Sequence, residues 1–118
     1  MCLHLDNRLI DDILVTYRCF FSKTDFIQAV MLRFEEVFMS LDPLKQPSRV
    51  RCYVLLRQWV REFWELDFES DGKAVNLILL SIDRVWRNVS EMMQPADKQL
   101  LLRLRGLIAK GNAVSGDF

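Results

Sequence analysis

Apolar residues recur every three or four positions through most of this chain, and that spacing is what most constrains its fold. Such a period places the apolar side chains along one face of each of several helices. The first stripe consists of Leu9, Ile10, Ile13, Leu14, Tyr17, Phe20 and Phe21. The second repeats its spacing and consists of Phe26, Ile27, Val30, Met31, Phe34, Val37 and Phe38. Because the β-branched residues fall inside helical stripes, we expect an all-α fold without strands.

The breaks between the stripes predict where the helices end. Ser22 is expected to end the first helix and cap the second, with Asp25 three residues later as in a capping box. The short connection predicts that these two helices form an antiparallel hairpin. Pro43 and Pro47 bracket the next break, and Ser48 is expected to cap a third helix that continues to about residue 67. This helix is apolar nearly all round, which indicates a central position.

Two more helices complete a predicted bundle of about five in a single domain, residues 1–118. The fourth spans about 73–92, and Leu77 and Leu80 fall opposite its core stripe, which indicates a second contact with another helix or with a partner. Asp97 is expected to cap the fifth helix and Gly111 to end it. Residues 112–118 are expected to fray.

Composition and charge bound the function. A chain of 118 residues with 51% hydrophobic content can form one domain with a substantial core. Sixteen basic and sixteen acidic residues cancel, so no general field favours nucleic acid, and the local group Arg49, Arg51 and Arg57 is interpreted as a solvated helix face. We find no apolar run long enough to span a membrane and no signal-peptide pattern. The odd, widely spaced cysteines indicate reduced thiols and a cytoplasmic protein.

Residue types with catalytic potential do not converge. The pairs Asp11/Asp12 and Glu35/Glu36 are adjacent on helices, so their carboxylates point about 100° apart. His4 is the only histidine, and no cysteine lies at metal-ligand spacing from it. The glycines are isolated, which excludes a phosphate-binding loop. We therefore expect no enzyme, catalytic residue, metal or cofactor, and interpret the tryptophans mainly as core, although any exposed remainder would mark an interface.

Three phrases in order carry a family resemblance over roughly residues 9–68. They are Leu14-Val15-Thr16-Tyr17-Arg18-Cys19-Phe20, then Arg49-Val50 with Leu56-Arg57-Gln58-Trp59-Val60, then Glu62-Phe63-Trp64 with Asp67-Phe68. In these phrases the chain resembles the Ras exchanger motif, the N-terminal domain of Ras-family guanine nucleotide exchange factors. The fourth and fifth helices match that family only as generic helical regions.

The resemblance implies a regulatory role. In that family this domain is not the catalyst but packs on a helical hairpin of a separate exchange domain, and holds the hairpin where it can open the nucleotide site of a Ras-like GTPase. No exchange domain follows within these 118 residues, so we do not expect exchange by this chain alone. We expect the docking surface among exposed members of the first two helices, with Tyr17, Phe20 and Phe21 as candidates.

A different class of function is a stand-alone helical adaptor. Such a protein would form homodimers or bind an unrelated partner through apolar residues on its outer face. The candidates for that face are Leu77, Leu80 and Leu102. A symmetric dimer in solution would distinguish this hypothesis from the exchange-factor module.

Overall fold

The computed structural model describes the backbone of residues 7–116 and the side chains of residues 8–111. The five α-helices are α1 (Asn7–Thr16), α2 (Lys23–Met39), α3 (Gln46–Glu62), α4 (Gly72–Val89) and α5 (Pro95–Gly116). Single helical turns lie between them: η1 (Tyr17–Cys19), η2 (Pro43–Lys45), the π-helical η3 (Trp64–Phe68) and η4 (Ser90–Met92). No strand occurs in this part of the chain, which confirms the predicted all-α class.

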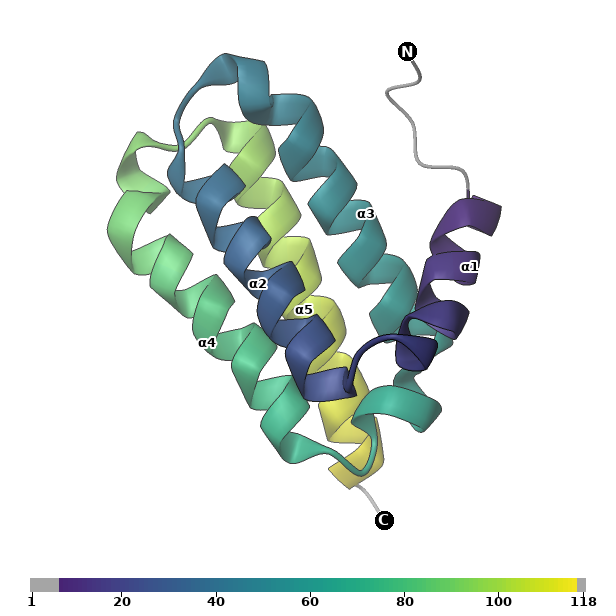
Figure 1. Cartoon of the computed structure of the whole chain (residues 1–118). Coiled ribbons are helices and arrows are strands. Elements are labelled where there is room, and N and C mark those ends of the chain that lie inside the picture. The colour runs from purple at the N-terminus through teal and green to yellow at the C-terminus, as the bar shows by residue number, and fades with distance from the viewer. Residues whose placement is uncertain (1–6, 117–118) are drawn as a thin grey trace.

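Helices α2 to α5 form a four-helix bundle, and α1 lies outside it against α3 (Figure 1). Around the bundle, α2 packs beside α3 and α4, and α5 packs beside the same two helices. The neighbours α2 and α4 run in the same direction, as do α3 and α5 (Figure 1). The connection from α3 to α4 therefore crosses the end of the bundle, and η3 lies on that crossing.

The predicted hairpin of the first two helices is wrong. Helix α1 packs mainly against α3 instead of lying along α2. The stripe of α1 is apolar, as expected, and its Ile10 and Leu14 are fully buried. An amphipathic period identifies the buried face of a helix but not the helix that covers it, and here α3 covers the face of α1.

The helix starts combine confirmed and corrected predictions. Ser22 caps α2 as expected, because its Oγ accepts a hydrogen bond from the Asp25 N–H at 3.1 Å. Helix α3 begins at Gln46 and not at Ser48. Pro47 therefore lies in its first turn, where a backbone N–H would have no carbonyl acceptor within the helix, so the missing N–H of proline costs nothing. Helix α5 begins at Pro95, so the predicted cap Asp97 lies inside the first turn.

The end of α5 also differs from expectation. Gly111 does not stop the helix, which continues to Gly116. A Cβ atom on Gly111 would lie 3.1 Å from Cδ2 of Trp64, so this glycine permits the close approach of η3 to α5. Expectations about Cys2, His4 and residues 117–118 lie outside the described residues.

The core lies between the four bundle helices. Its largest fully buried side chains include Trp59 of α3 and Phe34 and Phe38 of α2. Burying one such side chain contributes about 1.5–3 kcal/mol. Trp59 is also where the core meets η1 and η3, which together shape the surface described next.

Candidate docking surface

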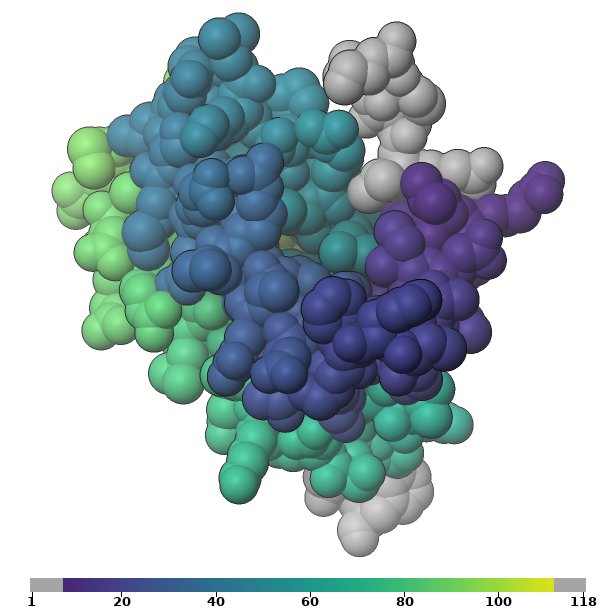
Figure 2. Space-filling view, viewed as in Figure 1, coloured from purple at the N-terminus to yellow at the C-terminus, as the bar shows by residue number. Residues whose placement is uncertain are grey.

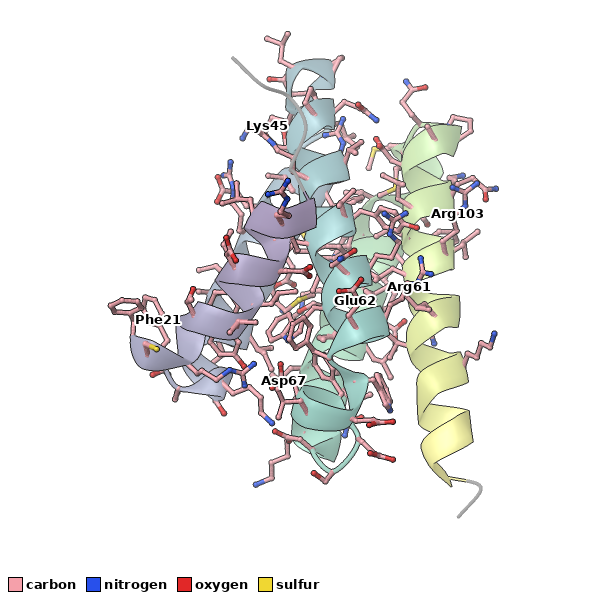
Figure 3. All side chains as sticks on the ribbon, turned by 90° about the vertical axis from the view of Figure 1, so that its right-hand side faces the viewer. Phe21, Lys45, Arg61, Glu62, Asp67 and Arg103 are labelled. Carbon is pink, nitrogen blue, oxygen red and sulfur yellow. The ribbon has the colours of Figure 1, made fainter. Side chains whose placement is uncertain are left out.

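The turn between α1 and α2 exposes two adjacent phenylalanines. The N–H groups of Phe20 and Phe21 both donate to the Tyr17 carbonyl at 2.9 Å, which closes η1 into a tight turn. The Phe20 side chain is 79% exposed and that of Phe21 is 56% exposed. The turn forms part of the front surface between α1 and α2 (Figure 2), and Phe21 lies at its outer edge (Figure 3).

Tyr17, predicted with them, occupies a different position. Its side chain is only 4% exposed, which corrects the expectation that it belongs to the exposed surface. The ring stacks on Phe26 at a centroid distance of 4.2 Å and meets Trp59 edge-on at 5.8 Å. Burial, and then the nearby Asp67 carboxylate, raise the pKa of the Tyr17 hydroxyl. Tyr17 therefore anchors the turn from beneath.

A polar group around the buried Asp67 carboxylate, which we call the Asp67 cluster, fixes this turn against the bundle. It consists of Arg18, Lys23, Trp59 and Asp67. The Asp67 carboxylate accepts hydrogen bonds from Nη1 and Nη2 of Arg18 at 3.0 and 3.2 Å, and from Nε1 of Trp59 at 2.7 Å. Lys23 Nζ donates to the Asp67 carbonyl at 2.9 Å. These donors offset the cost of burying a carboxylate, which is high when a charge lacks partners.

Further contacts extend the cluster in two directions. Arg18 Nη2 also donates to the Leu14 carbonyl at 2.9 Å, which ties the guanidinium to the last turn of α1. Lys23 Nζ lies 2.8 Å from Oδ2 of Asp71, the residue whose side chain caps α4. The hydrogen bond from Lys23 and that from the Ala74 N–H lower the pKa of Asp71. The turn with the phenylalanines is thus connected to α1, α3, η3 and the start of α4.

The sequence analysis quoted Arg18 and Asp67 as parts of the phrases but gave neither a role, and it interpreted Trp59 only as core. The available signal was a single arginine in the first phrase and an aspartate between the apolar residues Leu66 and Phe68 in the third. The distance between the phrases along the chain hid their pairing, because only the packing of α1 on α3 brings them together.

The outer-face candidates lie elsewhere and apart from one another. Leu77 is half-buried and Leu80 is 57% exposed, and both line a shallow groove between α2 and α4 together with Leu32. Leu102 lies at a cavity of about 320 Å³ between α4 and α5, beside Trp86. The structure therefore gives Leu77 the neighbouring helix that was expected, while much of Leu80 and Leu102 stays exposed.

Arg49 corrects another expectation. Its side chain is buried, so it does not belong to a solvated basic face. Its Nε lies 3.1 Å from Oδ2 of Asp97, and its Nη atoms donate to the carbonyls of Val37, Ser40 and Asp42 at 3.1, 2.7 and 3.2 Å. Asp97 is thus the charge partner of Arg49, and the pair joins α3, the loop after α2, and α5.

No described set of three or more histidine, cysteine or acidic side chains could hold a metal ion. Among the described helices, none combines the length and the apolar character required to cross a bilayer. The apolar hollows between α4 and α5 and between α2 and α4 present no convergent nucleophile and base. The exposed apolar side chains described above are suited to binding another protein.

Comparison with known proteins agrees with this geometry. The sequence model described as the RasGEF N-terminal motif matches residues 2–84. The match contains every member of the Asp67 cluster, the two exposed phenylalanines and most of α4, and it stops before α5. No curated protein and no solved structure matched the chain.

Proposed function

The chain belongs to the RasGEF N-terminal motif family, and from this membership we propose that it docks on a separate catalytic exchange domain and stabilises that domain's helical hairpin. Its partner is the exchange domain of a Ras-family exchange factor and, through it, a Ras-like GTPase. A docking module changes exchange only if it binds the competent position of the hairpin more tightly than the other position.

The exposed Phe20 and Phe21 pair carries the proposal for the docking surface. Large aromatic side chains are costly to leave in water and are enriched at the centres of interfaces. Here they stand on a turn whose backbone is held by Tyr17 below and by the Asp67 cluster beside it. A turn held in this way loses little conformational entropy on binding, which favours affinity.

We propose that the chain is not itself the catalyst and that it acts in the cytoplasm. The matched family is a non-catalytic N-terminal motif of exchange factors, and the odd, widely spaced cysteines indicate reduced thiols. Its contribution to nucleotide release would come entirely from binding.

Molar mass in solution, measured with and without a separately expressed Ras-family exchange domain, tests the proposal. We expect a complex that raises the rate of nucleotide release from the GTPase, and a Kd that increases about tenfold or more when Phe20 and Phe21 are both changed to serine. The matched control is Leu44→Ser, because Leu44 is 87% exposed on η2 at the opposite end of the bundle (Figure 1). Absence of a complex would refute the function, whereas a complex that tolerates the double serine variant would refute only the surface.

The second candidate function is a homodimeric adaptor. It is favoured by the apolar strip of Leu32, Leu77 and Leu80 along the groove between α2 and α4. A dimer that dissociates on Leu80→Asp and ignores the exchange domain would establish this alternative. Leu102→Asp tests the other predicted outer surface, which lies between α4 and α5. If this variant dissociates the dimer and Leu80→Asp does not, the interface lies on that face instead.

A further inference from the structure

Five arginines of the described residues have a carboxylate partner. Ion pairs join Arg18 to Asp67, Arg33 to Glu36, Arg49 to Asp97, Arg84 to Glu35 and Arg105 to Asp83. Arg57, Arg61 and Arg103 form no ion pair or side-chain hydrogen bond with a described residue, and unlike Arg87 of α4, which also forms none, they belong to the neighbouring helices α3 and α5. We call these three residues the arginine strip.

The packing of α3 on α5 brings the strip together. The two helices run in parallel, and their register is defined at both ends, by Arg49 against Asp97 and by Trp64 against Gly111. In this register Arg103 is level with residues 55–56, so the three arginines fall within about 8 Å along the helix axes. Arg61 and Arg103 both lie on the side where α3 and α5 run next to each other (Figure 3).

The guanidinium of Arg57 is held in place by a neighbouring ring, which favours binding of an anionic group. Its guanidinium lies 5.6 Å from the centroid of the Tyr53 ring, and its Nε is buried without an acceptor. The contact with the ring restricts the side chain, so binding a carboxylate costs less side-chain entropy. Arg61 follows four residues later on the same face of α3, which sets a spacing of about 6 Å between the two positions.

We propose that the face between α3 and α5 binds an acidic helical segment of a protein partner through the arginine strip. Two carboxylates four residues apart on an incoming helix have the same spacing as Arg57 and Arg61, and a guanidinium can bind a carboxylate through two parallel hydrogen bonds. Beside Arg103 on α5, the half-buried Leu100 and Leu107 offer an apolar surface for such a helix.

The charge distribution favours a peptide over an anionic membrane. Binding to acidic lipid requires a cluster of about four to eight cations, whereas this chain is neutral overall and Glu62 lies directly beside Arg61 (Figure 3). The face is also distinct from the Phe20 and Phe21 turn, so this proposal does not depend on the proposed docking function.

The test uses the full chain and a synthetic helical peptide of about 15 residues that carries glutamate pairs at i, i+4 among leucines. The matched peptide has glutamine in place of each glutamate. Fluorescence anisotropy should show binding of the glutamate peptide that weakens as salt increases. The double variant Arg61→Glu/Arg103→Glu should increase its Kd about tenfold or more.

Arg87→Glu is the control variant, because Arg87 is exposed on α4 and has no ion pair with a described residue. It should leave the Kd unchanged. The milder Arg61→Gln/Arg103→Gln variant, checked for an unchanged melting temperature, separates loss of binding from loss of folding. Equal affinity for the two peptides, or an unchanged Kd in the double variant, would overturn the proposal. So would binding to phosphatidylserine vesicles through the same arginines without binding to the peptide.

Discussion

The Arg18 guanidinium lies 3.0 Å from the Asp67 carboxylate, and this contact joins two phrases that are 49 residues apart in the chain. It determines where the turn after α1 lies on the bundle. Because only Cys19 separates Arg18 from Phe20 and Phe21, the same contact positions the exposed apolar pair. The buried Asp67 therefore controls the geometry of the proposed docking surface without belonging to that surface.

Replacing Asp67 should destabilise the fold strongly. Asp67→Ala leaves Arg18 and the buried Trp59 Nε1 without their acceptor, so we expect a loss of about 3 kcal/mol in the free energy of unfolding. Urea denaturation measures it. Glu36→Ala removes an exposed ion pair with Arg33 and should cost no more than about 0.5 kcal/mol. Similar losses in the two variants would show that the Asp67 cluster is not a structural anchor.

The pair Arg49 and Asp97 should behave as one buried unit. Arg49→Met leaves the Asp97 carboxylate buried without its counter-charge, and we expect a loss of about 3–5 kcal/mol. The double variant Arg49→Met/Asp97→Leu also removes the stranded charge, so it should be more stable than the Arg49→Met single variant. Thermal unfolding compares the variants. A double variant less stable than both singles would contradict the interpretation.

Two glycines of α5 provide a matched pair. A Cβ on Gly106 would meet nothing within 4 Å, so Gly106→Ala should stabilise the protein by about 0.5–1 kcal/mol through helix propensity. A Cβ on Gly111 would press on the Trp64 ring at 3.1 Å, so Gly111→Ala should lose this gain and destabilise the protein. Chemical denaturation distinguishes the two. Equal stabilisation would mean that η3 does not pack closely on α5.

The two described cysteines should differ in reactivity. Burial raises the pKa of the Cys52 thiol, whereas Cys19 is exposed on η1. Because the thiolate is the reactive form, iodoacetamide at neutral pH should modify Cys19 at least about tenfold faster than Cys52. Mass spectrometry of the digested protein measures both rates. Cys52→Ser serves as the control that leaves the Cys19 rate unchanged, and equal rates in the parent protein would contradict the prediction.

Local chemistry explains what the sequence determined by itself. The apolar period predicted the all-α class and the faces of the helices, and Ser22 was recognised as a cap because its Oγ needs only the N–H three residues later. The phrases around Tyr17, Trp59 and Asp67 indicated the family that the motif comparison then showed. Each of these features depends on residues within a few positions of one another, or on their order in the chain.

Only the tertiary structure decided which surfaces meet. A helical period states that one face is buried but not against what, so it did not reveal that α1 packs on α3 or that α3 runs beside α5. The same limit explains the misplaced residues. Tyr17 is buried because Phe26 and Trp59 surround it, and Asp97 is not a cap because α5 begins at Pro95, so its carboxylate instead pairs with the buried Arg49.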